Sequence, residues 1–420
     1  MARGNMHWLL LNSQPLAAPV AGLRRWAILR AQIRLCRVHS SSVPFAEVLM
    51  PTDIVLATLL LPIAEEFVHW PHDVDGGHAV LFLRARDGEA LRAEPRPGLL
   101  CEQSFKPDAE ALQRAGYALR DSAAVIDAAA NDVAANDVAA NDAAAYPLVI
   151  LLPPRQREEA RALMARAVRA TKRGGRVLAC IANTEGARSG EADLARLVGP
   201  VSTLTKNKCR AFWSAPLGDR VDHALVEQWL SLDALRPVVD GQFVSRPGLF
   251  AWDRIDPATA LLAAQLPTDL NGRVADLGAG HGLLTSLMLA RCPKLKAVDL
   301  FEAEARALDV ARINLAEAGE RVALTFHWHD VTAGLPRIFD NIVSNPPFHN
   351  VSRAALPEVG QRFITVASGA LRPGGSMWLV ANRHLPYEAV LKERFGLVKT
   401  VAEGNGYKVI EAVKTVRKRV

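Results

Sequence analysis

The sequence predicts an α/β protein in which a domain with one doubly wound, mostly parallel sheet occurs twice in tandem. Two pairs of similar segments indicate the duplication: residues 146–154 resemble 339–347, and residues 173–183 resemble 372–382. The members of these pairs lie 193 and 199 residues apart, which is the spacing of a domain-sized repeat. Strand-like and helix-like segments alternate, and this alternation predicts the α/β fold. In the second copy one strand also runs into a glycine-rich loop.

The second copy shows the strand pattern most clearly. Its apolar runs favour strands and alternate with helix-like stretches, and they lie at 273–277, 296–301, 322–328, 339–344 and 375–381. Each copy then ends in a helix-like stretch and a strand pair, at 192–214 and 389–413. The copies join near residues 235–247, where two prolines and a glycine interrupt the chain. Ligands of such sheets bind outside the carboxyl ends of the strands, so a site is expected there.

These patterns divide the chain into three parts. Residues 1–49 hold six Arg and one acid and form a basic extension, followed by the first copy at 50–236 and the second at 237–420. The extension has the composition of a transit peptide, of a non-native addition from an upstream start, or of a basic arm that touches RNA. We exclude it from the fold in each case. Residues 129–145 form a low-complexity repeat, interpreted as a surface loop or insertion.

Composition excludes several classes of protein. The chain has 420 residues, of which 50% are hydrophobic and 22% charged, so a large core is available and global disorder is excluded. Five scattered cysteines predict no metal site and reduced thiols in a cytoplasmic protein. The longest apolar run, 54–64, is shorter than the roughly 18–20 residues of a membrane helix and predicts a buried core segment. The net charge of +6 does not by itself establish a nucleic-acid partner.

The first candidate site lies at the end of the strand 273–277. Asp276 precedes a G-x-G-x-G loop made by Gly278, Gly280 and Gly282, and a helix-like stretch follows. Glycines allow a tight turn and close approach of the backbone to a ligand, and a helix N-terminus offers free N–H groups. The spacing differs from the dinucleotide pattern G-x-G-x-x-G and suits S-adenosylmethionine, which has no pyrophosphate. We expect Asp276 beside the ammonium group of that cofactor.

Further acids follow the next two strands. Asp299 and Glu302 both compete to hold the ribose hydroxyls, and a carboxylate suits this task because it accepts hydrogen bonds from both. A helix-like stretch begins directly after Glu302, which places Asp299 inside the strand, so Glu302 is the preferred candidate and Asp299 the alternative. Asp330 is the candidate acceptor for the adenine amino group. A solvated charge at a helix N-terminus and a plain turn residue are the structural interpretations of Glu302 and Asp330.

The most specific motif is Asn345-Pro346-Pro347-Phe348, which directly follows the strand 339–344. Two prolines after a buried strand are otherwise disfavoured, because proline cannot donate to the sheet. They stiffen the loop, while Asn345 adds an acceptor oxygen and Phe348 adds a stacking face. Together these four residues are the candidate catalytic site, which holds the amino group of a planar base.

The two loops together resemble class I S-adenosylmethionine-dependent methyltransferases that methylate an exocyclic or amide nitrogen. The segment 243–256 and His349 narrow the resemblance to ribosomal RNA guanine-N2 methyltransferases, the families of small subunit methyltransferase C and large subunit methyltransferase G. The resemblance covers about residues 146–420 and implies two tandem Rossmann-like domains, of which only the second binds cofactor. Leu152 matches Asn345 in the first copy and cannot accept a hydrogen bond, so that copy is expected to be degenerate.

The resemblance implies methyl transfer from S-adenosylmethionine to N2 of a guanine in ribosomal RNA, with the 16S RNA of the small subunit as the expected substrate. The expected partner is ribosomal RNA or a ribosomal subunit, and we expect a monomer that does not bind membranes. Three alternatives stay open: an adenine-N6 enzyme, a protein glutamine-N5 enzyme, and a non-catalytic RNA-binding assembly factor with a relict fold. A relict factor is not expected to bind the cofactor.

Overall fold

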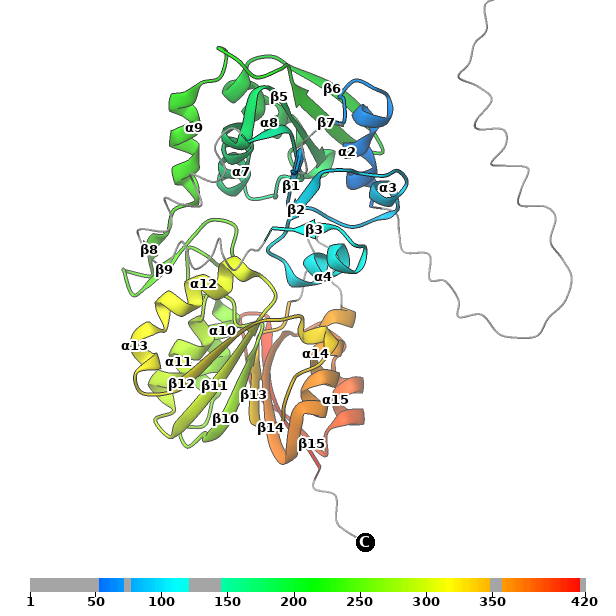
Figure 1. The fold of residues 1–420 in the computed structure, drawn as a ribbon. Coiled ribbons are helices and arrows are strands. Elements are labelled where there is room, and N and C mark those ends of the chain that lie inside the picture. The colour runs from blue at the N-terminus through cyan, green and yellow to red at the C-terminus, as the bar shows by residue number, and fades with distance from the viewer. Residues whose placement is uncertain (1–52, 72–76, 121–144, 348–356, 416–420) are drawn as a thin grey trace, which may run out of the picture. The chain divides into compact units, whose positions relative to one another are not determined.

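The structure is a computed structural model that describes residues 53–71, 77–120, 145–347 and 357–415. The predicted extension, nearly all of the low-complexity repeat and Phe348 lie outside these residues. Within them the chain forms two seven-stranded sheets (Figure 1), and we call the parts that carry them the first and second domains.

The first domain is built on a sheet with the order β3-β2-β1-β4-β5-β7-β6. Only the pairs that involve β7 are antiparallel. Its strands are β1 (Val80–Leu83), β2 (Leu99–Glu102), β3 (Ala118–Leu119), β4 (Tyr146–Leu151), β5 (Thr171–Ala182), β6 (Val201–Lys206) and β7 (Cys209–Ser214). Its helices are α2 (Ile54–Ala64), α3 (Glu89–Arg92), α4 (Lys106–Arg114), α7 (Arg157–Ala170), α8 (Ala187–Val198) and α9 (His223–Leu230).

The second domain repeats this order as β12-β11-β10-β13-β14-β16-β15, again with antiparallel pairs only at β16. Its strands are β10 (Gly272–Leu277), β11 (Leu295–Glu302), β12 (Ala323–Trp328), β13 (Phe339–Ser344), β14 (Leu371–Asn382), β15 (Leu397–Gly404) and β16 (Tyr407–Val413). Its helices are α10 (Pro257–Gln265), α11 (Leu283–Arg291), α12 (Ala305–Asn314), α13 (Ala316–Gly319), α14 (Pro357–Ala370) and α15 (Glu388–Arg394).

The matching strand orders confirm the predicted fold class and the tandem duplication. The repeated segments form β4 and β13 in one case and β5 and β14 in the other, with strands of equal length in each pair. In each domain the parallel strands are followed by one helix and one antiparallel strand pair, as the repeated segments predict, and in the first domain α9 comes after this pair. The apolar run 54–64 is the buried helix α2, with Pro62 inside it.

Helices cover both faces of the second sheet (Figure 1). Side chains alternate between the faces along β10, so that Ala275 packs with residues of α14 and α15, and Val274 packs with residues of α10 and α11. This is the doubly wound arrangement, and it places the carboxyl ends of β10, β11, β12 and β13 along one edge.

The chain between the domains forms a small antiparallel hairpin of β8 (Arg236–Val238) and β9 (Phe243–Ser245). The expected boundary between residues 236 and 237 falls inside β8. Asn314 at the end of α12 ties β9 to the second domain, since its Oδ1 accepts from Val244 N at 2.8 Å and its Nδ2 donates to Val244 O at 3.0 Å. In the described parts of the chain, no helix is long and apolar enough to span a membrane.

The two domains meet through corresponding turns, each of which follows the second strand of its own sheet. Phe105 and Glu304 form an isolated antiparallel bridge. Lys106 N donates to Ala303 O at 2.8 Å, and Ala305 N donates to Ser104 O at 2.9 Å. Because the contacting segments are equivalent in the two domains, this contact follows a local pseudo-two-fold relation.

Candidate functional site

The glycine loop joins β10 to α11 at the carboxyl edge of the second sheet. Gly278, Gly280 and Gly282 all have positive φ, at 74°, 55° and 89°, a conformation that glycine adopts without strain. A Cβ on Gly282 would lie 3.0 Å from Leu315 Cδ1, so this glycine also lets α12 approach. A Cβ on Gly280 would meet no heavy atom within 4 Å. Gly280 therefore borders space that no protein atom fills.

Asp276 lies beneath this loop and is fully buried. Its Oδ2 accepts a hydrogen bond from Thr285 Oγ1 at 2.7 Å, whereas its Oδ1 is buried without a partner. Burial raises the pKa of the Asp276 carboxyl to about 7, and the nearby Glu302 charge adds to the effect. A buried acceptor without a partner is costly, so this atom is suited to a cationic donor such as an ammonium group.

Glu302 is the last residue of β11 and lies against the glycine loop. Its Oε2 accepts from Gly280 N at 2.8 Å, and its Oε1 accepts from Glu304 N at 2.8 Å. Burial raises the pKa of the Glu302 carboxyl, and the two backbone donors oppose that effect. Each carboxylate oxygen keeps further acceptor capacity, which a pair of ribose hydroxyls can use.

The alternative acid, Asp299, lies inside β11 as predicted, and its carboxylate has other partners. Arg273 Nη1 lies 2.7 Å from Asp299 Oδ2, and His327 Nε2 lies 2.9 Å from Asp299 Oδ1. Asp299 is fully buried, so these contacts compensate its charge. The preference for Glu302 over Asp299 as the ribose acid stays a prediction.

Asp330 follows β12 and begins the short helix η3 (Val331–Ala333). Its Oδ1 accepts from Thr332 N at 2.8 Å and from Thr332 Oγ1 at 2.7 Å, which is a helix-capping arrangement. Asp330 therefore has a structural task, as its turn interpretation implies. Its contact with an adenine amino group stays a prediction.

Asn345 directly follows β13, the strand next to β10. Its Nδ2 donates to Asp256 Oδ2 and to Thr259 Oγ1, both at 2.9 Å. Its Oδ1 is buried and has no hydrogen-bond partner. The backbone oxygen of Asn345 lies 3.8 Å from the position that a Cβ on Gly278 would take, so the two loops are neighbours.

The sheet thus brings most of the predicted residues to one edge. Glu302 contacts Gly280 directly, and Asn345 lies beside Gly278. Asp330 follows a strand of the same edge and makes its hydrogen bonds within its own turn. Pro346 is buried and Pro347 is exposed, while Phe348 lies outside the described residues.

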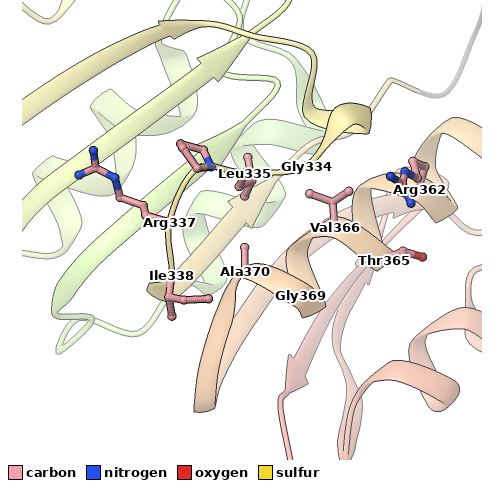
Figure 2. Close-up of a pocket in the computed structure, with 10 residues that line it drawn as sticks. Gly334, Leu335, Arg337, Ile338, Arg362, Thr365, Val366, Gly369 and Ala370 are labelled. Carbon is pink, nitrogen blue, oxygen red and sulfur yellow. The ribbon is translucent and has the colours of Figure 1, made fainter.

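A groove of about 490 Å³ lies elsewhere on this domain, between the segment 334–338 and α14. Figure 2 shows Arg337 and Arg362 near its opposite ends, with Leu335 and Val366 between them. None of the predicted site residues lines this groove, and it is therefore separate from the candidate site.

The corresponding edge of the first domain has the same strand order, but different residues stand at the candidate positions. Leu152 follows β4 where Asn345 follows β13, and it is buried. Arg84 follows β1 where Gly278 follows β10, and it keeps a positive φ of 53°. Gln103 corresponds to Glu302, since its Oε1 accepts from Phe105 N at 2.9 Å.

Gln103 also differs from Glu302 in the polarity that it presents to its neighbouring loop. Its Nε2 donates to Ala85 O at 2.7 Å, so an amide donor faces the loop where the second domain has an accepting carboxylate. An apolar side chain, an arginine and an amide therefore replace three residues of the candidate site. This agrees with a first domain that is degenerate.

Sequence reasoning missed the polar side chains that touch Asp276 and Asn345, namely Thr285, Asp256 and Thr259. Asp256 and Pro257 carry a helix-start signal, because Asp is a common N-cap and Pro a common first helical residue. That signal predicts the beginning of α10. It contains nothing about the second task of Asp256, its contact with Asn345 across 89 positions of sequence.

Comparison with known proteins adds independent information. The methyltransferase small domain family matches residues 240–411. The ribosomal RNA small subunit methyltransferase C of Shewanella amazonensis is 31% identical over 265 residues, which cover 63% of this chain and 76% of that protein. The protein of the same name from Pseudomonas aeruginosa is 31% identical over 276 residues, or 64% of this chain and 79% of that protein.

A solved structure is similar over most of the chain. It is a 16S rRNA N2 methyltransferase from T. thermophilus in complex with AdoMet and guanosine. The TM-score is 0.66 at 26% identity, and the match covers 86% of this chain and 92% of that one. The similarity therefore extends over both domains.

Proposed function

Since the chain belongs to the ribosomal RNA small subunit methyltransferase C family, we propose that it transfers a methyl group from S-adenosylmethionine to the exocyclic N2 of a guanine in 16S ribosomal RNA. The observation that carries this proposal is the buried, unpartnered Oδ1 of Asn345 beside the glycine loop. That atom is an acceptor suited to an amino group, placed next to the region suited to the cofactor.

The residues of the second domain fit S-adenosylmethionine. The unpartnered Asp276 Oδ1 would receive its ammonium group, Glu302 its ribose hydroxyls, and Asp330 its adenine amino group. The open space at Gly280 leaves room for it. When bound, the cofactor supplies a methyl group on a positively charged sulfur, which makes that carbon electrophilic.

The residues of the Asn-Pro-Pro loop would orient the substrate nitrogen. The lone pair of guanine N2 is delocalised into the ring, so the direction of its two N–H bonds matters. Asn345 Oδ1 would accept one N–H and the Pro346 carbonyl the other, with Pro347 stiffening the loop and Phe348 stacking on the base. No strong base is required, because positioning and electrostatics supply the rate.

The first domain has a supporting role in this proposal. We place it at residues 50–236 and the catalytic domain at 237–420, and we propose that the first domain positions RNA or assists folding. A guanine in folded RNA must be splayed out to reach such a loop. We further propose that the protein acts as a monomer in the cytoplasm, on ribosomal RNA or on a ribosomal subunit.

Mass mapping of modified guanines in ribosomal RNA tests the proposal. Cells that lack the gene should lose one N2-methylguanine from 16S RNA, and the purified protein should restore it in the presence of S-adenosylmethionine. An unchanged 16S pattern, together with no transfer in vitro, would refute the assigned substrate. A protein that binds no cofactor would instead be a relict.

A further inference from the structure

We propose that Asp256 and Thr259 are positioning residues that hold the side-chain amide of Asn345 with its oxygen directed at the substrate nitrogen. This inference rests on the proposed function, in which Asn345 Oδ1 accepts the amino group. It adds a separate claim, namely that the direction of the amide is imposed by residues that do not touch the substrate.

The contact begins at the N-terminus of α10. Asp256 is its N-cap, and Asp256 Oδ2 accepts from Thr259 N at 2.8 Å and from Thr259 Oγ1 at 3.0 Å. The same oxygen accepts from Asn345 Nδ2 at 2.9 Å. Asp256 and Thr259 are 8% and 6% exposed, so water does not compete freely for these bonds.

Both neighbours of the Asn345 amide accept its N–H groups. An ionised carboxylate has no hydrogen to donate. The Thr259 hydroxyl has one hydrogen, which it donates to Asp256, so it meets Asn345 only as an acceptor. The two N–H bonds of Asn345 therefore have two matching partners, and both lie on one side of the amide.

A reversed amide would fit the same space with the wrong polarity. The two ends of an amide have nearly the same shape, but rotation by half a turn would place the Asn345 oxygen against two acceptors. It would also turn N–H donors toward the substrate's amino group, which is itself a donor. The Asp256–Thr259 pair excludes this orientation and leaves Oδ1 buried and unpartnered.

A double-mutant cycle tests whether Asp256 acts through Asn345. We would measure single-turnover methyl transfer to 16S RNA, and cofactor affinity by calorimetry, for Asp256→Ala, Asn345→Ala and the double variant. Asp256→Ala should slow transfer by about 10-fold to 100-fold at unchanged cofactor affinity, the scale of a misplaced catalytic contact. In the Asn345→Ala background it should cost less than about 2-fold, because residues that act as one unit are not additive.

Three further variants separate positioning from a structural or charge effect. Asp222 is the N-cap of α9 in the first domain, where its Oδ1 accepts from Leu225 N at 2.9 Å. Asp222→Ala removes this equivalent cap bond, which is not part of the candidate site, and should leave methyl transfer unchanged. Asp256→Asn keeps an oxygen that can accept from Thr259 N, Thr259 Oγ1 and Asn345 Nδ2, so this variant should retain activity within about 10-fold. Thr259→Val keeps the cap acceptor and removes one acceptor of Asn345, so it should slow transfer even if Asp256→Ala fails to fold.

The outcomes distinguish this inference from the proposed function. A wild-type rate for Asn345→Ala would refute the role of Asn345 and the inference with it. A slow Asn345→Ala with wild-type rates for Asp256→Ala and Thr259→Val would overturn the inference alone. Independent, multiplicative losses would also overturn it, as would Asp256→Asn losing as much activity as Asp256→Ala, since charge would then be responsible.

Discussion

Thr285 Oγ1 donates to Asp276 Oδ2 at 2.7 Å and leaves the other oxygen of this buried carboxylate without a partner. Because burial raises the pKa of Asp276 to about 7, the unbound protein takes up a proton there as the pH falls through neutrality. A protonated Asp276 cannot attract an ammonium group. We expect S-adenosylmethionine affinity by calorimetry to fall about 10-fold from pH 8 to pH 6. Asp276→Asn should bind weakly at both pH values, and an unchanged wild-type affinity would contradict the assignment.

The same shift gives a second prediction, for the unbound protein. A carboxyl whose folded pKa lies above its unfolded value of about 3.9 adds stability that is fully present below the unfolded pKa and is lost as the pH rises through about 7. The difference in melting temperature between Asp276→Asn and wild type should therefore grow in favour of the variant from pH 5 to pH 8. Parallel melting curves across this range would contradict the burial of an uncompensated charge.

Gly280→Val should abolish cofactor binding, because its Cβ and two methyl groups would occupy space that no protein atom fills. A positive φ also makes valine strained at this position, so a matched control is needed. Gly116 in the first domain likewise has a positive φ, and a Cβ there would meet nothing within 4 Å. Gly116→Val should lose comparable stability and bind S-adenosylmethionine normally in calorimetry. Equal loss of binding in both variants would assign the effect to strain.

Glu302 and Asp299 should separate cleanly by mutation. Glu302→Gln replaces one accepting oxygen by a donor and should weaken cofactor binding by roughly 10-fold or more, the scale of a hydrogen bond to a charged group. Asp299→Asn should lower the urea midpoint of unfolding, because Arg273 and His327 lose a buried charged partner. Its cofactor affinity should stay near normal. The reverse pattern in these two measurements would make Asp299 the ribose acid.

A partly buried ion-pair cluster links the domains, and it should contribute to stability. Arg306 of α12 pairs with Glu159 of α7 and with Asp233, and Glu159 also pairs with Arg84. Arg306→Met would leave Glu159 with Arg84 and half-buried Asp233 with Arg246. The loss should therefore cost about 1–3 kcal/mol in urea unfolding, between the values for exposed and for buried pairs. Breaking the exposed Arg254–Asp253 pair with Arg254→Met should cost less than about 1 kcal/mol. Equal costs would mean that the cluster adds no stability.

Local patterns in the sequence predicted most of the fold and where several candidate residues lie relative to their strands. The spacing of two repeated motifs gave the tandem domains, and counting forward from Glu302 placed Asp299 inside β11. The sequence also placed Asn345 directly after the strand 339–344, and the structure shows that this strand pairs with β10. These predictions succeed because strand and helix periods and turn residues act over short distances.

The contacts that were missed join residues far apart in sequence. Asp256 and Asn345 are 89 positions apart, and Glu159 and Arg306 are 147 apart. No local pattern encodes such pairs, because they depend on how helices pack against the sheet. The equivalence of Gln103 to Glu302 was missed for another reason. It becomes visible only when the bonds from the backbone N–H groups of the two turns to these side-chain oxygens are compared.

Methyl transfer by Asn345→Ala is the most direct test of the central claim. We would compare single-turnover transfer to guanine N2 of 16S RNA by wild type and by this variant, with cofactor affinity measured in parallel. The glycine loop is untouched, so the variant should bind S-adenosylmethionine normally and transfer the methyl group roughly 10²-fold or more slowly, the scale of one lost oriented polar contact in a transition state. A wild-type rate would show that this loop is structural and that the reactive base lies elsewhere.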